Sequence, residues 1–186
     1  MMIRENINGH YPQIDHTAYI DPTAVIVGNV HIGKRVYVGP NVVIRADELT
    51  DIYTVGSITI GDDCNIQDGV IIHTLGDACV TIGSRTSLGH GCVIHAPCNI
   101  GAHCFIGYRS VISNADIGDW CYVGISVVAE GIKVEKRRVV PTGAILSYQQ
   151  QNADLLPVID KQRCDYMERV IDSNIKLTNG YNAINC

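Results

Sequence analysis

Residues 82–112 read IGSRTSLGHGCVIHAPCNIGAHCFIGYRSVI, and an aliphatic residue stands at every sixth position of this stretch. The same spacing continues toward both ends of the chain. It is interrupted by an irregular stretch in the first half, by a slip of four residues after Ile72 and by a five-residue step after Ile112. The repeat positions are Ile20, Ile26, Ile32, Val38, Ile44, Ile60, Ile66, Ile72, Ile82, Leu88, Ile94, Ile100, Ile106, Ile112, Ile117, Val123 and Ala129.

A period of six matches neither the 3.6-residue period of a helix nor the alternation of a single strand. It fits a short strand, a corner and another short strand, so three steps make one coil and stacked coils bury one apolar column. The sequence therefore predicts an all-β solenoid, a parallel β-helix of hexapeptide repeats, over residues 18–146. A lead segment at 1–17 precedes it. A C-terminal segment at 147–186 follows, with an α-helix over Leu155–Leu177 that packs alongside the coils and ends at Gly180.

The chain contains eight cysteines but no CxxC pair. Five of them lie four residues after a repeat position, which defines one recurring slot of the coil: Cys64, Cys92, Cys98, Cys104 and Cys121. Cysteine serves in such a slot as a small apolar side chain. We therefore expect these residues to be buried, reduced thiols rather than disulfide partners or metal ligands.

Lys and Arg total 14 against 19 Asp and Glu, which gives a net charge of −5. This balance argues against a nucleic-acid surface or an anionic-membrane surface. No apolar stretch approaches the length of a bilayer span, and the first residues lack the apolar core of a secretory signal. The expected location is cytoplasmic.

His73 and His95 each follow a repeat position by one residue. They are 22 residues apart, and subtracting the four-residue slip leaves 18, which is one coil. We therefore expect their side chains to stack about 4.8 Å apart, the spacing of neighbouring strands. Two imidazoles at that spacing can converge on one ion with metal–nitrogen bonds of about 2.0–2.1 Å.

His90 lies at the preceding corner, and five residues of extended chain place it up to about 16 Å from His95. Either His90 is unrelated to the pair, or it completes a metal site on another subunit. In a three-fold trimer, each site would take two histidines from one chain and one from the next, leaving a fourth position open for water. The remaining histidines are expected to be ordinary surface or core residues: His10, His16, His31 and His103.

Three segments together resemble the γ-class carbonic anhydrases. They are Ile44–Glu48 (IRADE), Asn65–His73 (NIQDGVIIH) and Leu88–His95 (LGHGCVIH), and the resemblance continues into Asn174–Leu177. It spans roughly residues 18–182. The order of the motifs is more specific than the hexapeptide repeat, which many acyltransferases share.

The resemblance implies that the β-helix is left-handed and that the protein is a homotrimer with metal sites between its subunits. It implies His73, His90 and His95 as ligands of zinc, or of iron(II) or cobalt. The implied reaction is the reversible hydration of carbon dioxide to bicarbonate and a proton by a metal-bound hydroxide.

The resemblance also implies roles for residues around the metal. Gln67 would orient the hydroxide or the substrate, with Asn65 and Asp68 supporting it, and Arg45 would pair with an aspartate across the trimer interface. Asp68 and His90 occupy the same slot one coil apart and should face one cleft. The full set of expected catalytic residues is Arg45, Asp47, Glu48, Asn65, Gln67, Asp68 and Asn174.

Two positions depart from the pattern of the best-known members. Gly76 stands where they carry a proton-shuttling glutamate, three residues after the first histidine, and Asp172 stands where they carry a tyrosine. Glu48 or Asp77 are the candidates to export the proton instead. Without an obvious shuttle, we expect proton release to limit turnover.

Alternative functions of different classes also fit parts of the pattern. One is a hexapeptide-repeat acyltransferase that uses acetyl-CoA or acyl carrier protein, with one histidine as its base, and another is a metal-dependent thioesterase acting on acyl-CoA. A third is a non-catalytic γ-like assembly subunit. Measuring bound metal together with carbon dioxide hydration distinguishes these alternative functions from carbonic anhydrase activity.

Overall fold

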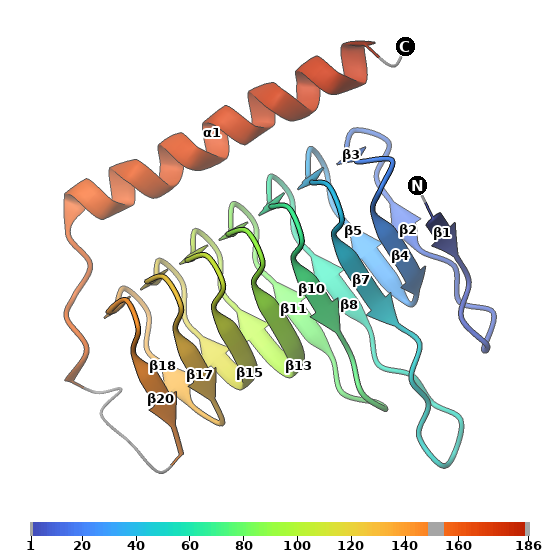
Figure 1. Ribbon diagram of the computed structural model, residues 1–186, viewed down its shortest axis with the longest axis horizontal. Helices are drawn as coiled ribbons and strands as arrows, with labels where there is room; N and C mark the ends of the chain where they lie inside the picture. The colour runs from blue at the N-terminus through green and yellow to red at the C-terminus, as the bar shows by residue number, and fades with distance from the viewer. Residues whose placement is uncertain (1, 149–154, 185–186) are drawn as a thin grey trace.

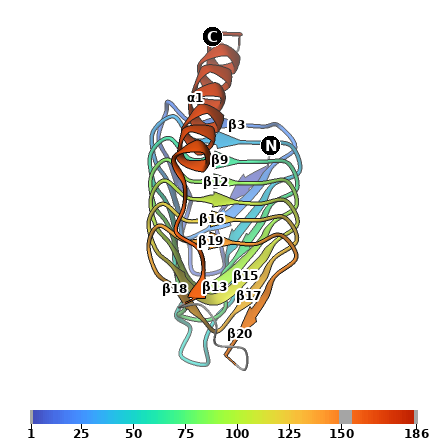
Figure 2. The same cartoon turned by 90° about the vertical axis from the view of Figure 1, so that its left-hand side faces the viewer.

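The computed structural model describes residues 2–148 and 155–184, in which short parallel strands wind into a left-handed β-helix with a helix laid along its side (Figure 1). The predicted fold class is confirmed. The expected C-terminal segment at 147–186 includes residues 149–154 and 185–186, which lie outside the described residues. Figure 2, which looks along the stack, shows the coils in line with the helix outside them.

Successive coils place their strands on three faces, and neighbouring strands pair in parallel. The first face contains β1 (Met2–Arg4), β4 (Val25–Gly28), β7 (Val43–Ala46), β10 (Ile71–His73), β13 (Val93–Ile100), β15 (Val111–Ile117), β17 (Val128–Glu130) and β20 (Ile145–Ser147). The second contains β2 (Gln13–Ile14), β5 (Val30–Ile32), β8 (Ile58–Ile60), β11 (Val80–Ile82), the second halves of β13 and β15, and β18 (Lys133–Val134). The third contains β3 (Tyr19–Ile20), β6 (Tyr37–Val38), β9 (Asn65–Ile66), β12 (Ser87–Leu88), β14 (Phe105–Ile106), β16 (Tyr122–Val123) and β19 (Val139–Val140).

The repeat positions form the core inside the coils. The largest fully buried side chains are Ile26, Ile44, Ile58, Ile60, Ile66, Ile72, Ile82, Leu88, Ile94, Ile100, Ile106 and Ile112. Two of the irregularities in the repeat are loops, at 47–57 and 74–79, that project side by side from the stack (Figure 1). Gly56 N donates to Gly76 O at 2.7 Å between them. The insertions therefore leave the coil itself undisturbed.

The cysteine slot is confirmed as a packing position. All five cysteines of the slot are at most 5% exposed. Four of the five thiols donate to backbone carbonyls: Cys64 Sγ to Gly83 O at 3.1 Å, Cys92 Sγ to Gly107 O at 3.0 Å, Cys104 Sγ to Gly118 O at 3.2 Å and Cys121 Sγ to Glu135 O at 3.2 Å. The seven cysteines among the described residues are free thiols.

The outward-facing row of each face has its own chemistry, because strand register aligns equivalent residues from coil to coil. The row on the first face is apolar: Val25, Val43, Ile71, Val93, Val111, Val128 and Ile145. The row on the second is polar: Gln13, His31, Thr59, Thr81, Asn99, Asp116 and Lys133. The row on the third is mostly aromatic or small and polar, and it lies largely buried beneath the helix: Tyr19, Tyr37, Asn65, Ser87, Phe105, Tyr122 and Val139.

Helix α1 (Lys161–Ile184) starts later and ends later than the sequence predicted. Asp160 caps its start, because Oδ1 accepts from the backbone N–H of Arg163 at 2.8 Å. The prediction that Gly180 ends the helix was wrong. Beyond Gly180, Tyr181 stacks on Tyr19 at 4.6 Å and Asn182 donates to Thr17 O at 3.0 Å. These contacts with the solenoid favour continued helix over a glycine stop.

The first two strands already lie within the first 17 residues. β1 pairs with β4 and β2 pairs with β5 of the following coil. Among residues 2–148 and 155–184, no helix has the length and apolar character needed to cross a membrane.

Candidate functional site

His73 and His95 are register partners on the first face. They are directly paired on β10 and β13, their ring centroids lie 5.4 Å apart, and the angle between the ring planes is 60°. Arg45 on β7 is the next residue of the same row. The coil-to-coil alignment expected from the repeat is therefore present, with the two rings edge-on rather than parallel, and both rings lie beside the apolar row of this face.

The nitrogens of this pair are suited to binding a cation. Nε2 of His73 is buried and makes no hydrogen bond, and it lies 3.5 Å from Oε1 of Glu48 and 4.0 Å from Oδ1 of Asp47. Burial lowers the pKa of His73, so the ring is neutral at neutral pH. The charges of Arg45 and His95 lower this pKa further, whereas the carboxylate of Glu48 raises it. Nδ1 of His95 lies 3.0 Å from Ala96 O; because a carbonyl only accepts, this nitrogen carries the proton and Nε2 keeps its lone pair.

His90 is held at a different corner by two glycines. A Cβ on Gly89 would lie 2.6 Å from Cδ1 of Tyr108 and 2.9 Å from Ile106 O, so only glycine fits there. Gly91 has φ +69°, in the left-handed region that favours glycine. The Gly89–His90–Gly91 sequence thus makes a tight corner that presents His90 outward.

Asp68 lies beside His90, as the shared slot predicted. Oδ2 of Asp68 is 3.4 Å from Nδ1 of His90, and each side chain is about half exposed, 51% and 52%. A carboxylate on the second ring nitrogen is the usual way in which proteins orient a metal-binding imidazole. Nε2 of His90 therefore faces away from its own carboxylate partner.

Gln67 has its amide group fixed by two hydrogen bonds. Its Nε2 donates to Oδ1 of Asn65 at 2.7 Å and to Oδ1 of Asn174 at 3.1 Å. Asn65 in turn donates to Oγ of Ser87 at 2.8 Å, and Asn174 donates to Val170 O at 2.8 Å. Because both amide hydrogens of Gln67 are used, its Oε1 is left to accept a hydrogen bond.

A small cavity of about 90 Å³ opens between the third face and helix α1. It is lined by Asn65, Gln67, Ser87, Gly89, His90, Phe105, Tyr108, Tyr166 and Val170. Burial, together with the neighbouring Tyr108, raises the pKa of Tyr166, so its hydroxyl is neutral at neutral pH. The cavity has room for a few water molecules, and hence for a substrate of similar size.

Sequence reasoning missed several lining residues. Ser87 could have been found, because it follows Asn65 by one coil in the same slot. Tyr108 lies one coil after His90, and its ring is 5.4 Å from the imidazole. Tyr166 carries no signal in the repeat, because its place depends on where α1 lies.

The predicted site residues fall into two places. One contains Arg45, Asp47, Glu48, His73 and His95, and the other contains Asn65, Gln67, Asp68, His90 and Asn174. Within the described part of the chain, no group of three or more His, Cys, Asp or Glu side chains is arranged to hold a metal ion. Arg45 pairs with Asp47 of its own chain, at 3.1 and 3.2 Å.

The two departures from the family pattern also have definite places. Gly76 lies in the loop after β10 and has φ +59°. A glutamate would not adopt this backbone angle without strain. Asp172 is engaged with the solenoid, because its Oδ1 accepts from Nη2 of Arg85 at 2.9 Å.

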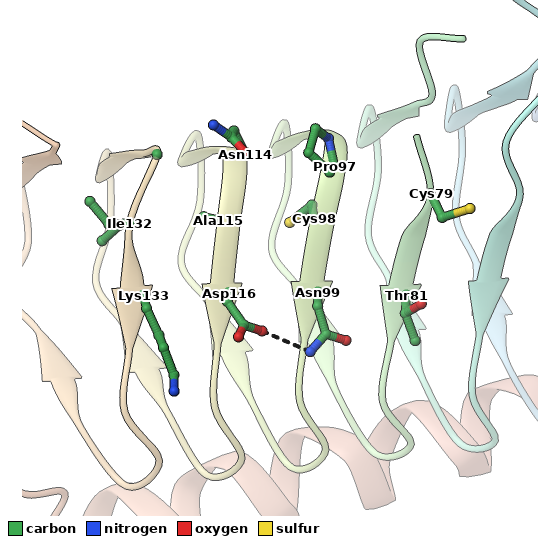
Figure 3. Close-up of a pocket in the computed structure, with 11 residues that line it drawn as sticks. Cys79, Thr81, Pro97, Cys98, Asn99, Asn114, Ala115, Asp116, Ile132 and Lys133 are labelled. Atoms are coloured by element: carbon green, nitrogen blue, oxygen red, sulfur yellow. Dashed lines mark hydrogen bonds between the residues drawn. The ribbon is translucent and has the colours of Figure 1, made fainter. Parts of the chain in front are cut away.

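An open groove of about 650 Å³ lies elsewhere, on the second face (Figure 3). It runs along the polar row, where Asn99 donates to Asp116 at 2.8 Å. The residues that line it include none of the predicted ligands. We therefore do not assign the candidate site to it.

Comparison with known proteins identifies the class. Residues 11–46 and 79–114 match the family described as bacterial transferase hexapeptide (six repeats). A hexapeptide transferase family protein from Anaplasma phagocytophilum has the same fold, with a TM-score of 0.79 and 23% identity over 97% of this chain and 98% of that one. The fold and its repeats thus define a hexapeptide-repeat protein.

The carbonic anhydrase of Methanosarcina thermophila is 32% identical over 191 residues, covering 91% of this chain and 74% of that protein. The carboxysome assembly protein CcmM of Nostoc sp. is 40% identical over 179 residues, covering 91% of this chain. This chain spans only 31% of that longer relative. The chain belongs to the γ-class carbonic anhydrase family of hexapeptide-repeat proteins.

Proposed function

We propose that this chain is a γ-class carbonic anhydrase that hydrates carbon dioxide reversibly to bicarbonate and a proton, at metal sites shared between the subunits of a homotrimer. The observation that carries the proposal is the register pair of His73 and His95 on neighbouring strands, with Nε2 of His73 buried and without a hydrogen-bond partner. Buried polar atoms are nearly always paired, so this nitrogen is suited to a ligand.

The donor set fits a metal such as zinc, iron(II) or cobalt. His73 and His95 of one chain and His90 of the next would hold it, with Asp68 orienting His90. When bound, such a metal supplies hydroxide near neutral pH by lowering the pKa of water to about 7.

The apolar row on the first face supports the sharing of sites. Ile71, Val111 and Ile145 are 42%, 36% and 60% exposed, and they continue a row that is apolar from coil to coil. A contiguous exposed apolar strip marks an interaction surface. Because His73 and His95 lie beside this strip, a second copy that covers it would approach the histidine pair with its own surface.

The residues around Gln67 would bind and orient the reacting groups. Oε1 of Gln67 accepts a hydrogen bond from the attacking oxygen, which fixes the direction of its remaining lone pairs. The cavity beside Gln67 is the proposed place for carbon dioxide, next to the side chain that orients the attacking oxygen. Glu48, with 43% of its side chain exposed, links the surroundings of His73 to solvent and is our candidate to export the proton.

The direct test is a metal-reconstitution experiment. The protein is stripped with a chelator and reloaded with zinc in air, or with iron(II) or cobalt without oxygen, and carbon dioxide hydration and bound metal are measured at each stage. Hydration that disappears and returns with about one metal per chain supports the proposal. Full metal occupancy without hydration contradicts it.

A second candidate is a non-catalytic assembly subunit, favoured by the 40% identity to a relative named as an assembly protein. The same experiment separates the two functions, because a non-catalytic scaffold would show no carbon dioxide hydration even when it is fully loaded with metal. An acyl-CoA transfer and hydrolysis assay on the reloaded protein tests the acyltransferase and thioesterase alternatives.

A further inference from the structure

One corner of the solenoid carries a column of large side chains that faces helix α1. Arg85, His103 and Trp120 occupy equivalent positions on successive coils, two residues before the strands of the third face, with φ of 57°, 55° and 60°. The backbone of each corner is bonded to the next; His103 N donates to Ser84 O at 2.9 Å. His103 also stacks on Trp120, with centroids 4.3 Å apart and 3° between planes. The column is therefore a rigid edge.

Two carboxylates one turn apart on α1 meet this edge. Glu168 accepts from Nε and Nη2 of Arg85, the former at 3.0 Å, and its Oε1 lies 2.7 Å from Nδ1 of His103. Asp172 accepts from Nη2 of Arg85 at 2.9 Å. The side chains of Arg85 and Glu168 are 26% and 29% exposed, so solvent only partly screens this pair. A planar guanidinium held at several points fixes orientation as well as distance.

The carboxylates and Asn174 lie on opposite flanks of the buried stripe of α1. Met167, Ile171 and Thr178 form that stripe. At about 100° per residue, Glu168 falls on one side of it and Asn174 on the other. A roll of the helix about its axis therefore moves both flanks together. Apolar packing alone restrains such a roll weakly, because it is not directional.

We propose that Arg85, Glu168 and Asp172 are positioning residues that set the roll of α1 and so hold Asn174 against Gln67. The predicted effect on kcat rests on the proposed function, whereas the predicted effect on the contact between Asn174 and Gln67 does not. With Asn174 in place, both amide hydrogens of Gln67 are engaged and its Oε1 stays turned toward the reacting oxygen. Asp172 then belongs to the group of residues that positions the helix.

The test uses Glu168→Gln, which keeps the shape of the side chain but removes its charge. The matched control is Asn182→Ala, which removes a different bond between α1 and the solenoid, the one to Thr17 O. Both are made alone and in an Asn174→Ala background, in the zinc-loaded protein. We expect Glu168→Gln to lower kcat about tenfold through misorientation of Gln67, with unchanged KM and zinc content. Asn182→Ala should leave kcat unchanged.

The Asn174→Ala background separates positioning from general loosening. If Glu168 acts through Asn174, Glu168→Gln causes no further loss of kcat there. An equal loss in both backgrounds overturns the proposal. Should Glu168→Gln fail to fold, Asp172→Asn takes its place, because it removes the charge of one partner of Arg85 and leaves Glu168. No further loss of kcat in the Asn174→Ala background then supports the proposal, and an equal loss in both backgrounds overturns it.

A crystal structure of the metal-free variant gives a readout independent of activity. We expect Asn174 Oδ1 to move out of hydrogen-bonding range of Gln67 Nε2, and an unchanged contact overturns the proposal. If the zinc-loaded parent protein shows no hydration, the proposed function fails, while the crystal structure still decides whether the helix is positioned in this way.

Discussion

His73 and His95 are paired residues on neighbouring parallel strands, and their rings lie 5.4 Å apart although 22 positions separate them in the sequence. The loop at 74–79 absorbs the four additional residues, so the register of the coil is restored before β11 begins. The pair is the geometric basis of the proposed metal centre. His90, the third proposed ligand, lies in a separate place of the same chain, so the proposed metal centre depends on how chains assemble.

The apolar row should hold the trimer together. Val111→Asp places a carboxylate in the middle of this row, where it would lose hydration on association, so we expect trimers to dissociate into monomers and bound metal to be lost. The matched control is Thr81→Asp on the polar row of the second face, which should remain trimeric. Sedimentation velocity and metal analysis measure both. A trimeric Val111→Asp protein with full metal would show that this face is not the interface.

Gln67→Glu should reduce turnover without releasing metal. A carboxylate cannot donate to Asn65 and Asn174, so the side chain loses both bonds that fix its orientation. We expect kcat to fall by about two orders of magnitude, because misplacement by 1 Å can cost that much. Stopped-flow hydration and zinc content are the measurements. A variant with parental kcat would remove Gln67 from the mechanism.

The core prediction concerns stability alone. Ile94 is fully buried, so Ile94→Ala should lower the free energy of unfolding by about 2–5 kcal/mol. Thr81→Ala on the exposed polar row should change it by less than about 0.5 kcal/mol. Urea unfolding at equal chain concentration compares them. Equal effects at the two positions would contradict the assignment of inward and outward residues.

The cysteine slot makes a prediction about reactivity. Burial raises the pKa of Cys64 and of Cys98 to about 12, whereas Cys79 is exposed. Because the thiolate is the reactive form, a raised pKa keeps buried thiols protonated and slow at pH 8. Cys79→Ser should remove one fast-reacting thiol per chain in a thiol-reagent titration, and Cys64→Ser should remove none. Loss of a fast thiol in Cys64→Ser would contradict the burial.

Much of the solenoid could be predicted from the sequence, because a period of six fixes which residues share a row. That regularity alone predicts His73 next to His95 and Asp68 beside His90. The helix could not be placed in the same way. Its end beyond Gly180 depends on contacts of Tyr181 and Asn182 with the first coils, which no local signal in the helix encodes.

The same limit applies to the cavity and to the positioning of α1. Tyr166 and Glu168 acquire their roles only where the helix crosses the third face, so the repeat gives no indication of them. Arg85 occupies an ordinary corner position in the sequence pattern. Its proposed positioning role follows from the carboxylates of Glu168 and Asp172, which lie 83 and 87 residues away in the sequence.

Mixed trimers test the shared metal site most directly. Chains carrying His90→Ala and chains carrying His95→Ala are unfolded, mixed in equal amounts and refolded with zinc, beside each variant alone and the parent protein. Neither variant alone can form a complete site, but every mixed ring contains one interface with all three histidines. We expect mixing to restore about a quarter of the parental zinc and hydration activity, from random assembly into three-fold rings. A mixture that binds no more zinc than its two components, while the refolded parent binds fully, would contradict a site built from neighbouring chains.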